Sequence, residues 1–416
     1  MELKRVVVTG LGTVSPIGNT IPEYWEALIS GVSGADYITH FDASKFKTQF
    51  ACEVKNLDIS NFFDRKEARK YDLYAQYALI CVEEAFLDSK IDTAKLDLNR
   101  AGVIWGSGIG GINTFLSECK DFIKGDGTPR FNPFFIPKMI SDIAAGHISI
   151  KYGFRGPNFT TTSACASSAN SVIDAYNYIR FGIADLFITG GSEAAINEAG
   201  IGGFNAMHAI STRNDSPKTA SRPFAADRDG FVLGEGGGAL ILEEYEHAIK
   251  RGAKIYAEVI GGGMSADAYH MTAPHPEGDG AVSVMLNALN DAKLSKEQID
   301  YINVHGTSTP AGDVAEIKAI VRVFGEHAPN LNISGTKSMT GHLLGAAGAI
   351  ESIATILAIK NDLIPPTINK YELDPEISPI LNLTFEKAQK RVVNYGMSNT
   401  FGFGGHNACV VFKKYV

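Results

Sequence analysis

Short runs of apolar residues alternate along the chain with longer segments in which apolar residues recur every three or four positions. A short continuous apolar run is typical of a strand that is buried on both faces, and such runs occupy residues 6–9, 103–105, 158–162, 185–189, 239–242, 255–260, 301–305 and 408–412. The helical spacing predicts helices over residues 22–29, 64–87, 138–150, 174–181, 245–250, 281–292 and 342–359. This alternation indicates an α/β protein whose sheets are covered by helices on both faces.

The same pattern suggests that the chain consists of two halves. A buried run opens the chain at residues 5–10, and a similar run begins again at 255–261, after Arg251 and Gly252. Each run then continues as strand, helix and strand, and no flexible or low-complexity linker separates the two. We therefore expect an N-terminal half of residues 1–252 that packs closely against a C-terminal half of residues 253–416.

Composition and charge narrow the possible partners. The 38 basic and 46 acidic residues give a net charge of −8, so a broad nucleic-acid-binding surface is not expected. The five cysteines form no CxxC pair, which argues against a disulfide framework or a zinc site. The N-terminus lacks a signal-peptide core, and the apolar helix at 342–359 carries Glu351, which favours a buried helix over a membrane span. These features predict a cytoplasmic protein.

Cys165 lies between a predicted strand and a predicted helix. Residues 158–162 are β-branched and aromatic, as in a buried strand. After the cysteine, apolar residues follow helical spacing at Ala169, Val172, Ile173, Tyr176 and Ile179. We expect a sharp turn here, with helix N-terminal N–H groups that favour the thiolate. The alternative is an inert buried cysteine, and position alone leaves both interpretations open.

Three later stretches have the same form, in which a reactive side chain ends a strand and small residues follow it. They read NVHGTSTPAGD at 303–313, GTKSMTGH at 335–342 and MSNTFGFGGHN at 397–407. Each has an ordinary explanation by itself: a hydrogen-bonded histidine, a turn lysine or core phenylalanines. Together they predict one site, because ligands bind α/β sheets at the carboxyl ends of strands. A thiolate beside two imidazole N–H donors suits acyl transfer.

In these motifs the chain resembles the β-ketoacyl-[acyl-carrier-protein] synthases of the thiolase superfamily, and within them the synthase II group. The resemblance runs from Arg5 to Lys413. Its motifs are SACASS at 163–168, RPFAADRDGFVLGEGGGAL at 222–240, NVHGTSTPAGD at 303–313, GTKSMTGHLLGAAGAIE at 335–351 and NTFGFGGHN at 399–407. The resemblance implies a thiolase-like fold of two duplicated halves in αβαβα layers. It also implies an acyltransferase of fatty-acid synthesis, which extends acyl chains by two carbons through decarboxylative Claisen condensation.

The resemblance also assigns roles to residues of this chain. Cys165 matches the acyl-accepting nucleophile, and His305 and His342 match the pair that holds the malonyl thioester carbonyl. Lys337 matches a lysine that shapes the electrostatics near His342. The remaining catalytic and substrate roles are implied for Glu316 as the partner of Lys337, for Phe403 as gate and oxyanion-hole donor with Cys165, for Thr307 and Thr309 at the pantetheine arm, and for Phe401 and Ile109 at the acyl group.

Partners follow from the same resemblance. The implied partners are acyl carrier proteins and a second copy of the chain in a homodimer, with no cofactor, no nucleic acid and no membrane. Residues 64–70 concentrate four cations at the start of a predicted helix, which is ordinarily a solvated face. The resemblance instead places Lys66, Arg69 and Lys70 in a carrier-docking patch that Arg130 extends. A structural monovalent cation is implied at Asn303, Glu351, Ser398 and Asn399.

Four rival classes differ from this chain in identifiable residues. A thiolase uses one histidine and a second cysteine in a Cys-Gly motif, whereas Val410 follows Cys409 here. An initiating synthase replaces one histidine by asparagine, and a non-catalytic chain-length subunit lacks the cysteine. A cysteine hydrolase needs a base oriented at Cys165, and no local protease motif is present. His406 stands where many relatives have threonine, outside the catalytic set.

Overall fold

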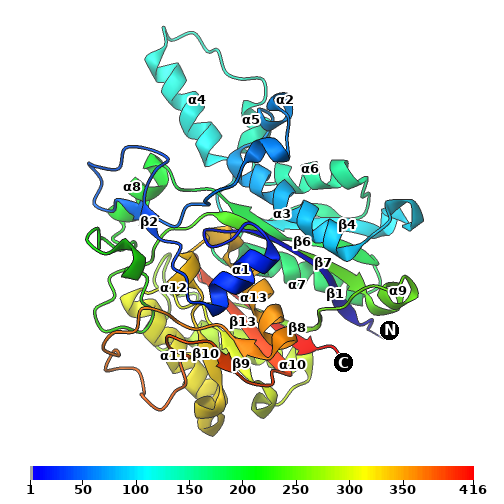
Figure 1. The fold of residues 1–416 in the computed structure, drawn as a ribbon, viewed down its shortest axis with the longest axis vertical. Coiled ribbons are helices and arrows are strands. Elements are labelled where there is room, and N and C mark those ends of the chain that lie inside the picture. Colours follow the sequence, from blue (N-terminus) through cyan, green and yellow to red (C-terminus); the bar gives the residue numbers. More distant parts are fainter. Residues whose placement is uncertain (1–2) are drawn as a thin grey trace.

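The computed structural model describes residues 3–416, and its central sheet has ten strands. Figure 1 shows the arrangement of the sheet and its helices. The strand order is β10-β9-β13-β14-β8-β1-β7-β6-β4-β5. The strands are β1 (Val6–Val14), β4 (Ala101–Gly106), β5 (Asn158–Thr161), β6 (Leu186–Glu193), β7 (Gly236–Glu244), β8 (Ala257–Ala266), β9 (Tyr301–Asn303), β10 (Asn332–Ser334), β13 (Tyr395–Gly402) and β14 (His406–Lys414). Short pairs form two further ribbons from β2 (Asp36–Tyr37) with β3 (Phe50–Ala51) and β11 (Leu363–Ile364) with β12 (Gln389–Lys390).

The sheet repeats one topology twice, as the sequence pattern predicted. In the first half β1 pairs antiparallel with β7 and β7 antiparallel with β6, while β4 runs parallel to both β6 and β5. In the second half β8, β14, β13, β9 and β10 follow the same order and directions. The halves join where three residues of β1 pair with β8. The boundary at residue 252 stays a prediction.

Helices cover both halves and also fill the space between them. The helices are α1 (Ile21–Ile29), α2 (Arg65–Ala68), α3 (Leu73–Ser89), α4 (Ile112–Lys124), α5 (Phe135–Met139), α6 (Ile143–Tyr152), α7 (Ser167–Arg180), α8 (Glu198–Ala206), α9 (Tyr245–Lys250), α10 (Asp279–Ala292), α11 (Pro310–Phe324), α12 (Lys337–Thr340) and α13 (Ala347–Asn361). Helix α3 packs on β1 and β7, and α10 packs on β8 and β14. Helices α7 and α13 pack on each other and on strands of both halves, so the predicted αβαβα layering is confirmed.

Close approach of α7 and α13 depends on small residues. A Cβ atom at Gly348 would lie 2.7 Å from the Ala169 Cβ atom, closer than real contacts allow. The Ala349 N–H donates to the Ser168 hydroxyl at 2.9 Å across the same contact. Cys165 precedes α7 and His342 precedes α13, so the packing of these two helices brings the two halves of the predicted site together.

Two predicted helices are each two helices in the structure. The segment 64–87 breaks after α2, because Asp72 caps α3 by accepting the Tyr74 N–H and also accepts two hydrogen bonds from Thr114. The segment 138–150 breaks between α5 and α6, where Ile140 is extended and its carbonyl accepts the Tyr74 hydroxyl. Both breaks are stabilised by tertiary hydrogen bonds, which apolar spacing does not reveal.

Other boundaries also differ from the expected ones. Residues 397–407, which we expected to be a strand-end loop, form the hairpin of β13 and β14. The apolar segment that begins at His342 becomes helical at Leu344 as a 3₁₀ turn and at Ala347 as α13. Helices α4, α8 and α11 and strand β10 were not predicted.

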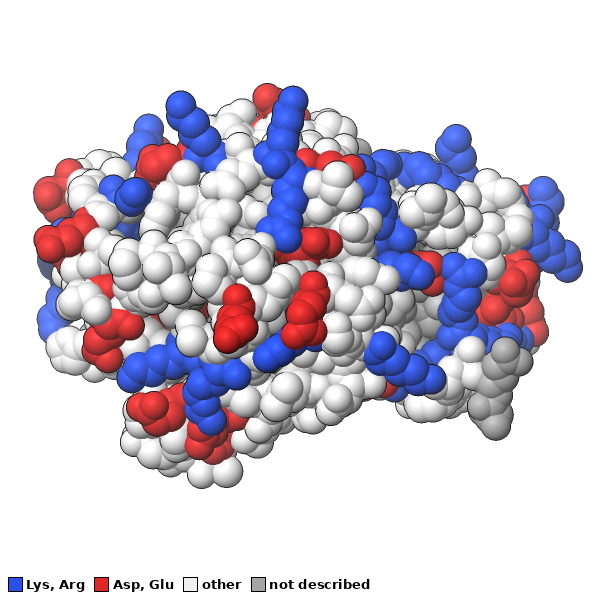
Figure 2. Space-filling view, turned by 90° about the horizontal axis from the view of Figure 1, so that it is seen from below, with Lys and Arg blue, Asp and Glu red and all other residues white. Residues whose placement is uncertain are grey.

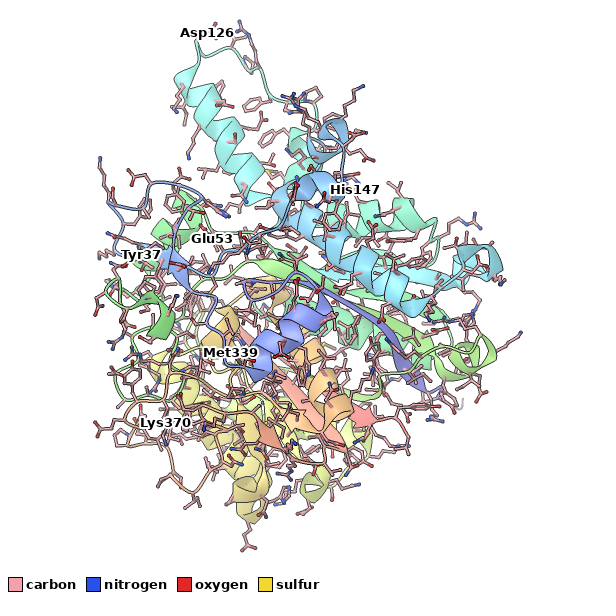
Figure 3. The ribbon with its side chains drawn as sticks, viewed as in Figure 1. Tyr37, Glu53, Asp126, His147, Met339 and Lys370 are labelled. Atoms are coloured by element: carbon pink, nitrogen blue, oxygen red, sulfur yellow. The ribbon has the colours of Figure 1, made fainter. Side chains whose placement is uncertain are left out.

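The α4 helix and the loop that follows it project from the body of the molecule, and Asp126 lies at the tip of this projection (Figure 3). Basic and acidic side chains are interspersed on the face seen in Figure 2. Among residues 3–416, no helix combines the length and the hydropathy that a membrane crossing requires.

Candidate active site

Cys165 lies on a tight turn between β5 and α7. Ala164 has a φ of +50°, a left-handed conformation that L-residues other than Asn and Asp rarely adopt. Gly402 of β13 packs against the turn, and a Cβ atom there would lie 2.7 Å from the Ser163 carbonyl oxygen and 3.0 Å from the Cys165 nitrogen. The strained turn and the missing side chain at Gly402 together hold the cysteine at the start of α7, as the sequence predicted.

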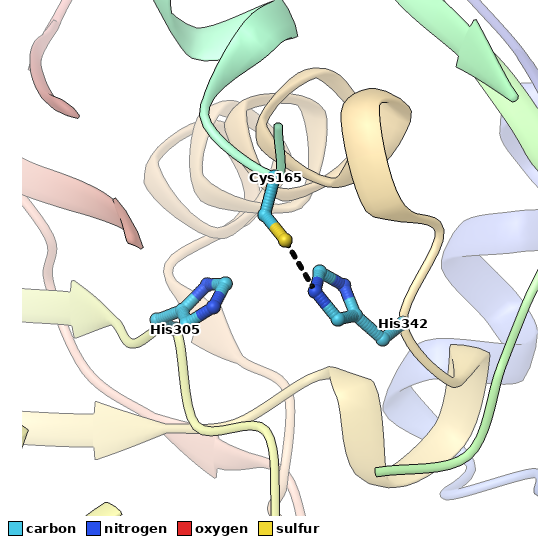
Figure 4. Close-up of side chains that lie close together, drawn as sticks. All are labelled: Cys165, His305 and His342. Atoms are coloured by element: carbon cyan, nitrogen blue, oxygen red, sulfur yellow. Dashed lines mark hydrogen bonds between the residues drawn. The ribbon is translucent and has the colours of Figure 1, made fainter. Parts of the chain in front are cut away.

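The two histidines of the later motifs lie beside Cys165 (Figure 4). His342 Nε2 lies 3.0 Å from Cys165 Sγ. The His305 and His342 rings are 5.2 Å apart between centroids and nearly perpendicular, at 85°. One ligand atom from each of the three residues falls within 4.8 Å of the others, and all three residues are buried. The structure therefore brings together the three residues on which the sequence interpretation depends.

Backbone hydrogen bonds fix each histidine. The His305 and Gly306 N–H groups each donate to the Glu316 carboxylate of α11 at 2.9 Å. The His342 N–H donates to the Val232 carbonyl at 2.7 Å, and the Phe231 ring packs edge-on against the His342 ring. Both imidazoles thus extend from anchored backbone, which keeps them aimed at the thiol.

Lys337 contacts His305 and Glu351. Its ammonium lies 3.3 Å from His305 Nδ1 and forms an ion pair with Glu351, with both side chains fully buried. We expected Glu316 to be the partner of Lys337, and this was wrong. The reason is that Glu316 on α11 is occupied by backbone N–H groups, whereas Glu351 on α13 faces the ammonium directly. Because an ammonium can only donate, His305 Nδ1 accepts and the neutral ring carries its proton on Nε2.

Burial controls the protonation of the site. It raises the pKa of the Cys165 thiol to about 12, opposed by Lys337 and by the Phe403 backbone N–H. The expected thiolate is therefore not favoured in the free protein, because loss of hydration is the largest influence on the pKa of the thiol. Burial, together with the positive charge of Lys337, also lowers the pKa of His305 and of His342 well below the ordinary value. Both imidazoles are therefore neutral at neutral pH.

A cavity of about 590 Å³ opens in front of these three residues. Its walls are mostly apolar, and the substrate residues predicted from the sequence lie among them: Ile109, Thr307, Thr309, Phe401 and Phe403. The Thr307 and Thr309 hydroxyls are 3.0 Å apart, and the Phe401 ring lies 5.7 Å from the His305 ring. A thiol and two neutral N–H donors at the base of an apolar cavity can accept and hold an acyl group.

Comparison with known families decides the class of this arrangement. The family description "Beta-ketoacyl synthase, N-terminal domain" matches residues 3–248, and "Beta-ketoacyl synthase, C-terminal domain" matches residues 256–370. The chain belongs to the beta-ketoacyl synthase family. Family membership agrees with the resemblance found in the sequence motifs and with the cysteine and two histidines at the cavity base.

Similar proteins extend over the whole chain. A 3-oxoacyl-[acyl-carrier-protein] synthase 2 of Synechocystis is 48% identical over 417 residues, which is 100% of this chain and 99% of that protein. A protein of the same name from Staphylococcus aureus is 48% identical over 412 residues, 99% of each chain. Among solved structures, a beta-ketoacyl synthase from Burkholderia phymatum has a TM-score of 0.92 at 35% identity over 99% of this chain and all of that one. A type II polyketide ketosynthase solved in complex with its acyl-carrier protein has a TM-score of 0.89 at 34% identity over both full chains.

The residues predicted for carrier docking lie outside the cavity of this family member. Lys66, Arg69 and Lys70 are exposed on α2 and on the turn that follows it. Helix α2 has a single turn and ends at Ala68, so the cations lie on this turn and on the residues after it, not at the start of the long helix expected over 64–87. Arg130 is exposed and lies 3.4 Å from Asp126 in the loop after α4.

Of the residues predicted for a cation, Asn303 and Glu351 contact each other near Lys337, whereas the Asn399 amide contacts Glu316 and Met285. Ser398 pairs in register with Asn303 across β13 and β9, and the Asn303 amide donates to the Glu351 carbonyl at 3.4 Å. Three buried oxygens here have no hydrogen-bond partner: Glu351 Oε2, Ser398 Oγ and Asn399 Oδ1. Oxygen ligands without donors are what a hard monovalent cation requires, so these residues fit the implied ion.

The sequence analysis did not identify the buried residues that fix the loops of the site. Arg228 is buried and contacts Asp313, Asp374 and the Thr309 and Pro310 carbonyls, which fixes the loop after His305. The charged run Asp227-Arg228-Asp229 inside the motif at 222–240 is the signal that could have found it. A second missed residue, Glu193, has no such signal, because it only ends a buried strand.

Proposed function

We propose that this protein is a 3-oxoacyl-[acyl-carrier-protein] synthase of the synthase II group, which joins an acyl group on Cys165 to malonyl carrier protein. The observation that carries the proposal is the 3.0 Å contact of Cys165 Sγ with His342 Nε2, with His305 beside it at the base of an apolar cavity. The curated relatives bear the name of that activity over their full length.

In the first half-reaction the Cys165 sulfur attacks the acyl thioester carbonyl. Its S–C bond forms while the bond to the pantetheine sulfur breaks, and the proton lost by Cys165 leaves with the carrier thiol. The backbone N–H groups of Cys165 and Phe403 hold the tetrahedral oxyanion. The approach of the Phe403 N–H to Cys165 supports this assignment, since that group lowers the thiol pKa.

In the second half-reaction malonyl carrier protein loses CO₂, and the bond electrons form an enolate. The Nε2–H groups of His305 and His342 donate to the enolate oxygen, which requires the neutral rings that burial maintains. The enolate carbon attacks the Cys165 thioester. The tetrahedral intermediate then expels the Cys165 thiolate, which takes up a proton, and the β-ketoacyl chain is two carbons longer.

Lys337 and the cation residues support this donor pair. The Lys337 ammonium donates to His305 Nδ1, so the ring presents its proton on Nε2 toward the substrate. Asn303, Glu351, Ser398 and Asn399 would hold a monovalent cation that balances the buried carboxylate, and we assign no step to the ion. No organic cofactor takes part in the proposed reaction.

Different residues of the cavity wall contact different parts of the substrate. Thr307 and Thr309 meet the pantetheine arm, and Phe403 gates access to Cys165 with Phe401 beside it. Ile109 limits the acyl chain length at the end of the cavity. The adjacent positions of these side chains around one cavity support the division.

The proposed partners are an acidic carrier protein and a second copy of the chain. Lys66, Arg69, Lys70 and Arg130 dock the acidic carrier protein, and the protein works in the cytoplasm as a homodimer. Two surfaces suit a second copy. Within residues 3–416, edge strand β5 pairs only with β4, and the projection of α4 and α5 exposes apolar side chains at Phe122, Ile123, Phe134 and Ile136.

The test separates the two half-reactions. Cys165→Ala should abolish acyl transfer and retain malonyl decarboxylation, because both N–H donors remain. His342→Ala should lose most of the decarboxylation, by about a hundredfold for one donor of the pair, while Cys165 still accepts an acyl group. Circular dichroism controls for folding. Loss of both half-reactions in both folded variants would contradict the assigned roles.

A further inference from the structure

Glu193 is a buried carboxylate at the end of β6, and its surroundings are unusual. Its side chain is fully shielded from solvent. Within residues 3–416 no Lys, Arg or His side chain forms an ion pair with it, unlike Glu351 beside Lys337. A buried carboxylate without a cation requires other strong donors.

Backbone N–H groups supply those donors. Glu193 Oε2 accepts from Gly108 N at 2.7 Å and from Gly345 N at 3.1 Å. Its Oε1 accepts from Ile109 N at 3.2 Å and Gly110 N at 3.3 Å, and from the Ser107 hydroxyl at 3.2 Å. Three successive N–H groups of one loop thus converge on a single carboxylate, and a fourth comes from a loop of the other half.

The two loops that Glu193 joins both form the wall of the cavity. Gly108 and Ile109 of the first loop line it, and so does Leu344, next to Gly345, of the second. The loops touch here: a Cβ atom at Gly345 would lie 2.3 Å from the Gly108 nitrogen, and one at Gly108 would lie 2.9 Å from Glu193 Oε2. The carboxylate therefore sets the separation of the two backbones and the place from which the Ile109 side chain extends.

We propose that Glu193 is a positioning residue that fixes the Ile109 wall of the cavity and thereby sharpens the limit on acyl chain length. This inference rests on the proposed function, in which the cavity receives the acyl chain. Glu193 does not line the cavity and contacts no reacting atom. Its charge is one of the influences that raise the pKa of the Cys165 thiol, but its effect on chain length acts through the backbone of residues 108–110.

Glu193→Gln tests the proposal because it replaces one acceptor oxygen by an NH₂ group that faces N–H donors. The loop at 108–110 should loosen, and its amides should exchange with deuterium at least tenfold faster, as expected for loss of one charge-assisted hydrogen bond. Discrimination between the longest accepted and the first rejected acyl chain should fall about tenfold in kcat/KM. Among short primers, which end before Ile109, the ratios of kcat/KM should stay the same, because loss of the charge near Cys165 affects all chain lengths equally.

Two further variants keep the test decisive. Glu84→Gln is the matched control: Glu84 on α3 is a largely buried carboxylate that accepts the Thr13 and Ile21 N–H groups at 2.8 and 2.7 Å, away from the cavity. It should leave exchange at 108–110 and chain-length discrimination unchanged. Ser107→Ala removes one donor to Glu193 and is the milder variant if Glu193→Gln does not fold. Its hydroxyl also accepts the Gly110 N–H at 3.1 Å, so exchange in this variant is compared at residues 108 and 109, where it should rise together with a relaxed chain-length limit.

The outcomes separate this inference from the proposed function. Faster exchange at 108–110 together with a relaxed chain-length limit supports it. Unchanged exchange in a folded Glu193→Gln or Ser107→Ala protein overturns it, whatever the activity, because hydrogen exchange does not depend on catalysis. An equal change of chain-length discrimination in Glu84→Gln also overturns it, since any loss of stability would then suffice. If the wild-type protein condenses no acyl chain, the proposed function fails instead.

Discussion

At the scale of single residues, Cys165 shows two opposing influences on one thiol. The start of α7 and the Phe403 N–H stabilise negative charge, whereas complete burial removes the hydration of the thiolate. The pKa near 12 means that burial is the larger effect in the free protein. The reactivity of Cys165 therefore depends on hydrogen-bond donors that stabilise the sulfur and the oxyanion during the reaction. It depends less on thiolate that is already present in the free protein.

This balance predicts the pH dependence of Cys165 alkylation. Below its pKa the thiolate fraction rises tenfold with each pH unit, so the rate of reaction with iodoacetamide should rise with a slope near one from pH 7 to pH 10. The rate is measured by peptide mass spectrometry, and Cys165→Ala corrects for the four other cysteines. A plateau that begins below pH 9 would show a thiolate stabilised in the free protein.

At the scale of elements, apolar spacing predicted most strands and helices to within a few residues. It missed the break at Asp72, because tertiary hydrogen bonds to Thr114 override a continuous apolar face. It also missed β10 and the glycine-rich start of β7, since neither short strands nor glycine carries an apolar period. The motifs identified Cys165, His305 and His342, whereas the Lys337–Glu351 pair could not be predicted, because it joins α12 to α13 in space.

Helix α2 carries the prediction for carrier docking. Reversing Lys66 and Arg69 to glutamate should raise KM for acyl carrier protein about tenfold at low salt, because opposite charges accelerate association. The increase of KM with added salt should flatten in the variant. Turnover of a small pantetheine thioester should stay the same.

The control is the same charge change elsewhere on the surface. Lys387→Glu with Lys390→Glu alters two exposed lysines of the second half and should leave both substrates unaffected. Equal losses of activity on carrier-bound and small substrates in the α2 variant would mean that α2 supports the fold, not the docking of the partner.

At the scale of the whole molecule, the two halves repeat one topology and each supplies part of the site. The first half contributes Cys165 at the start of α7, and the second contributes His305 after β9 and His342 before α13. Contacts between the halves, such as Glu193 with Gly345, join positions 152 residues apart. Such contacts determine the shape of the cavity, and no local pattern in the sequence indicates them.

The open edge of β5 and the exposed apolar side chains of α4 and α5 predict that the protein forms a homodimer. Sedimentation equilibrium should give twice the chain mass of 44.6 kDa. Ile123→Asp with Ile136→Asp should weaken the dimer at least tenfold, because charges would be buried in an apolar interface. Ile380→Asp in the second half is the control, because Ile380 is 68% exposed and lies outside α4, α5, α6 and β5. A wild-type monomer, or equal dissociation in the control, would contradict the proposed surface.

The central claim is that Cys165 carries the acyl group between the two half-reactions. The most direct test is to load the protein from acyl carrier protein, add malonyl carrier protein, and follow the protein by intact-mass spectrometry. Acyl carrier protein should add one acyl mass to the protein, and peptide mapping should place it on Cys165 alone. Malonyl carrier protein should then discharge the adduct and yield β-ketoacyl carrier protein two carbons longer. An adduct that also forms on Cys165→Ala, or one on Cys165 that malonyl carrier protein does not discharge, would contradict the account.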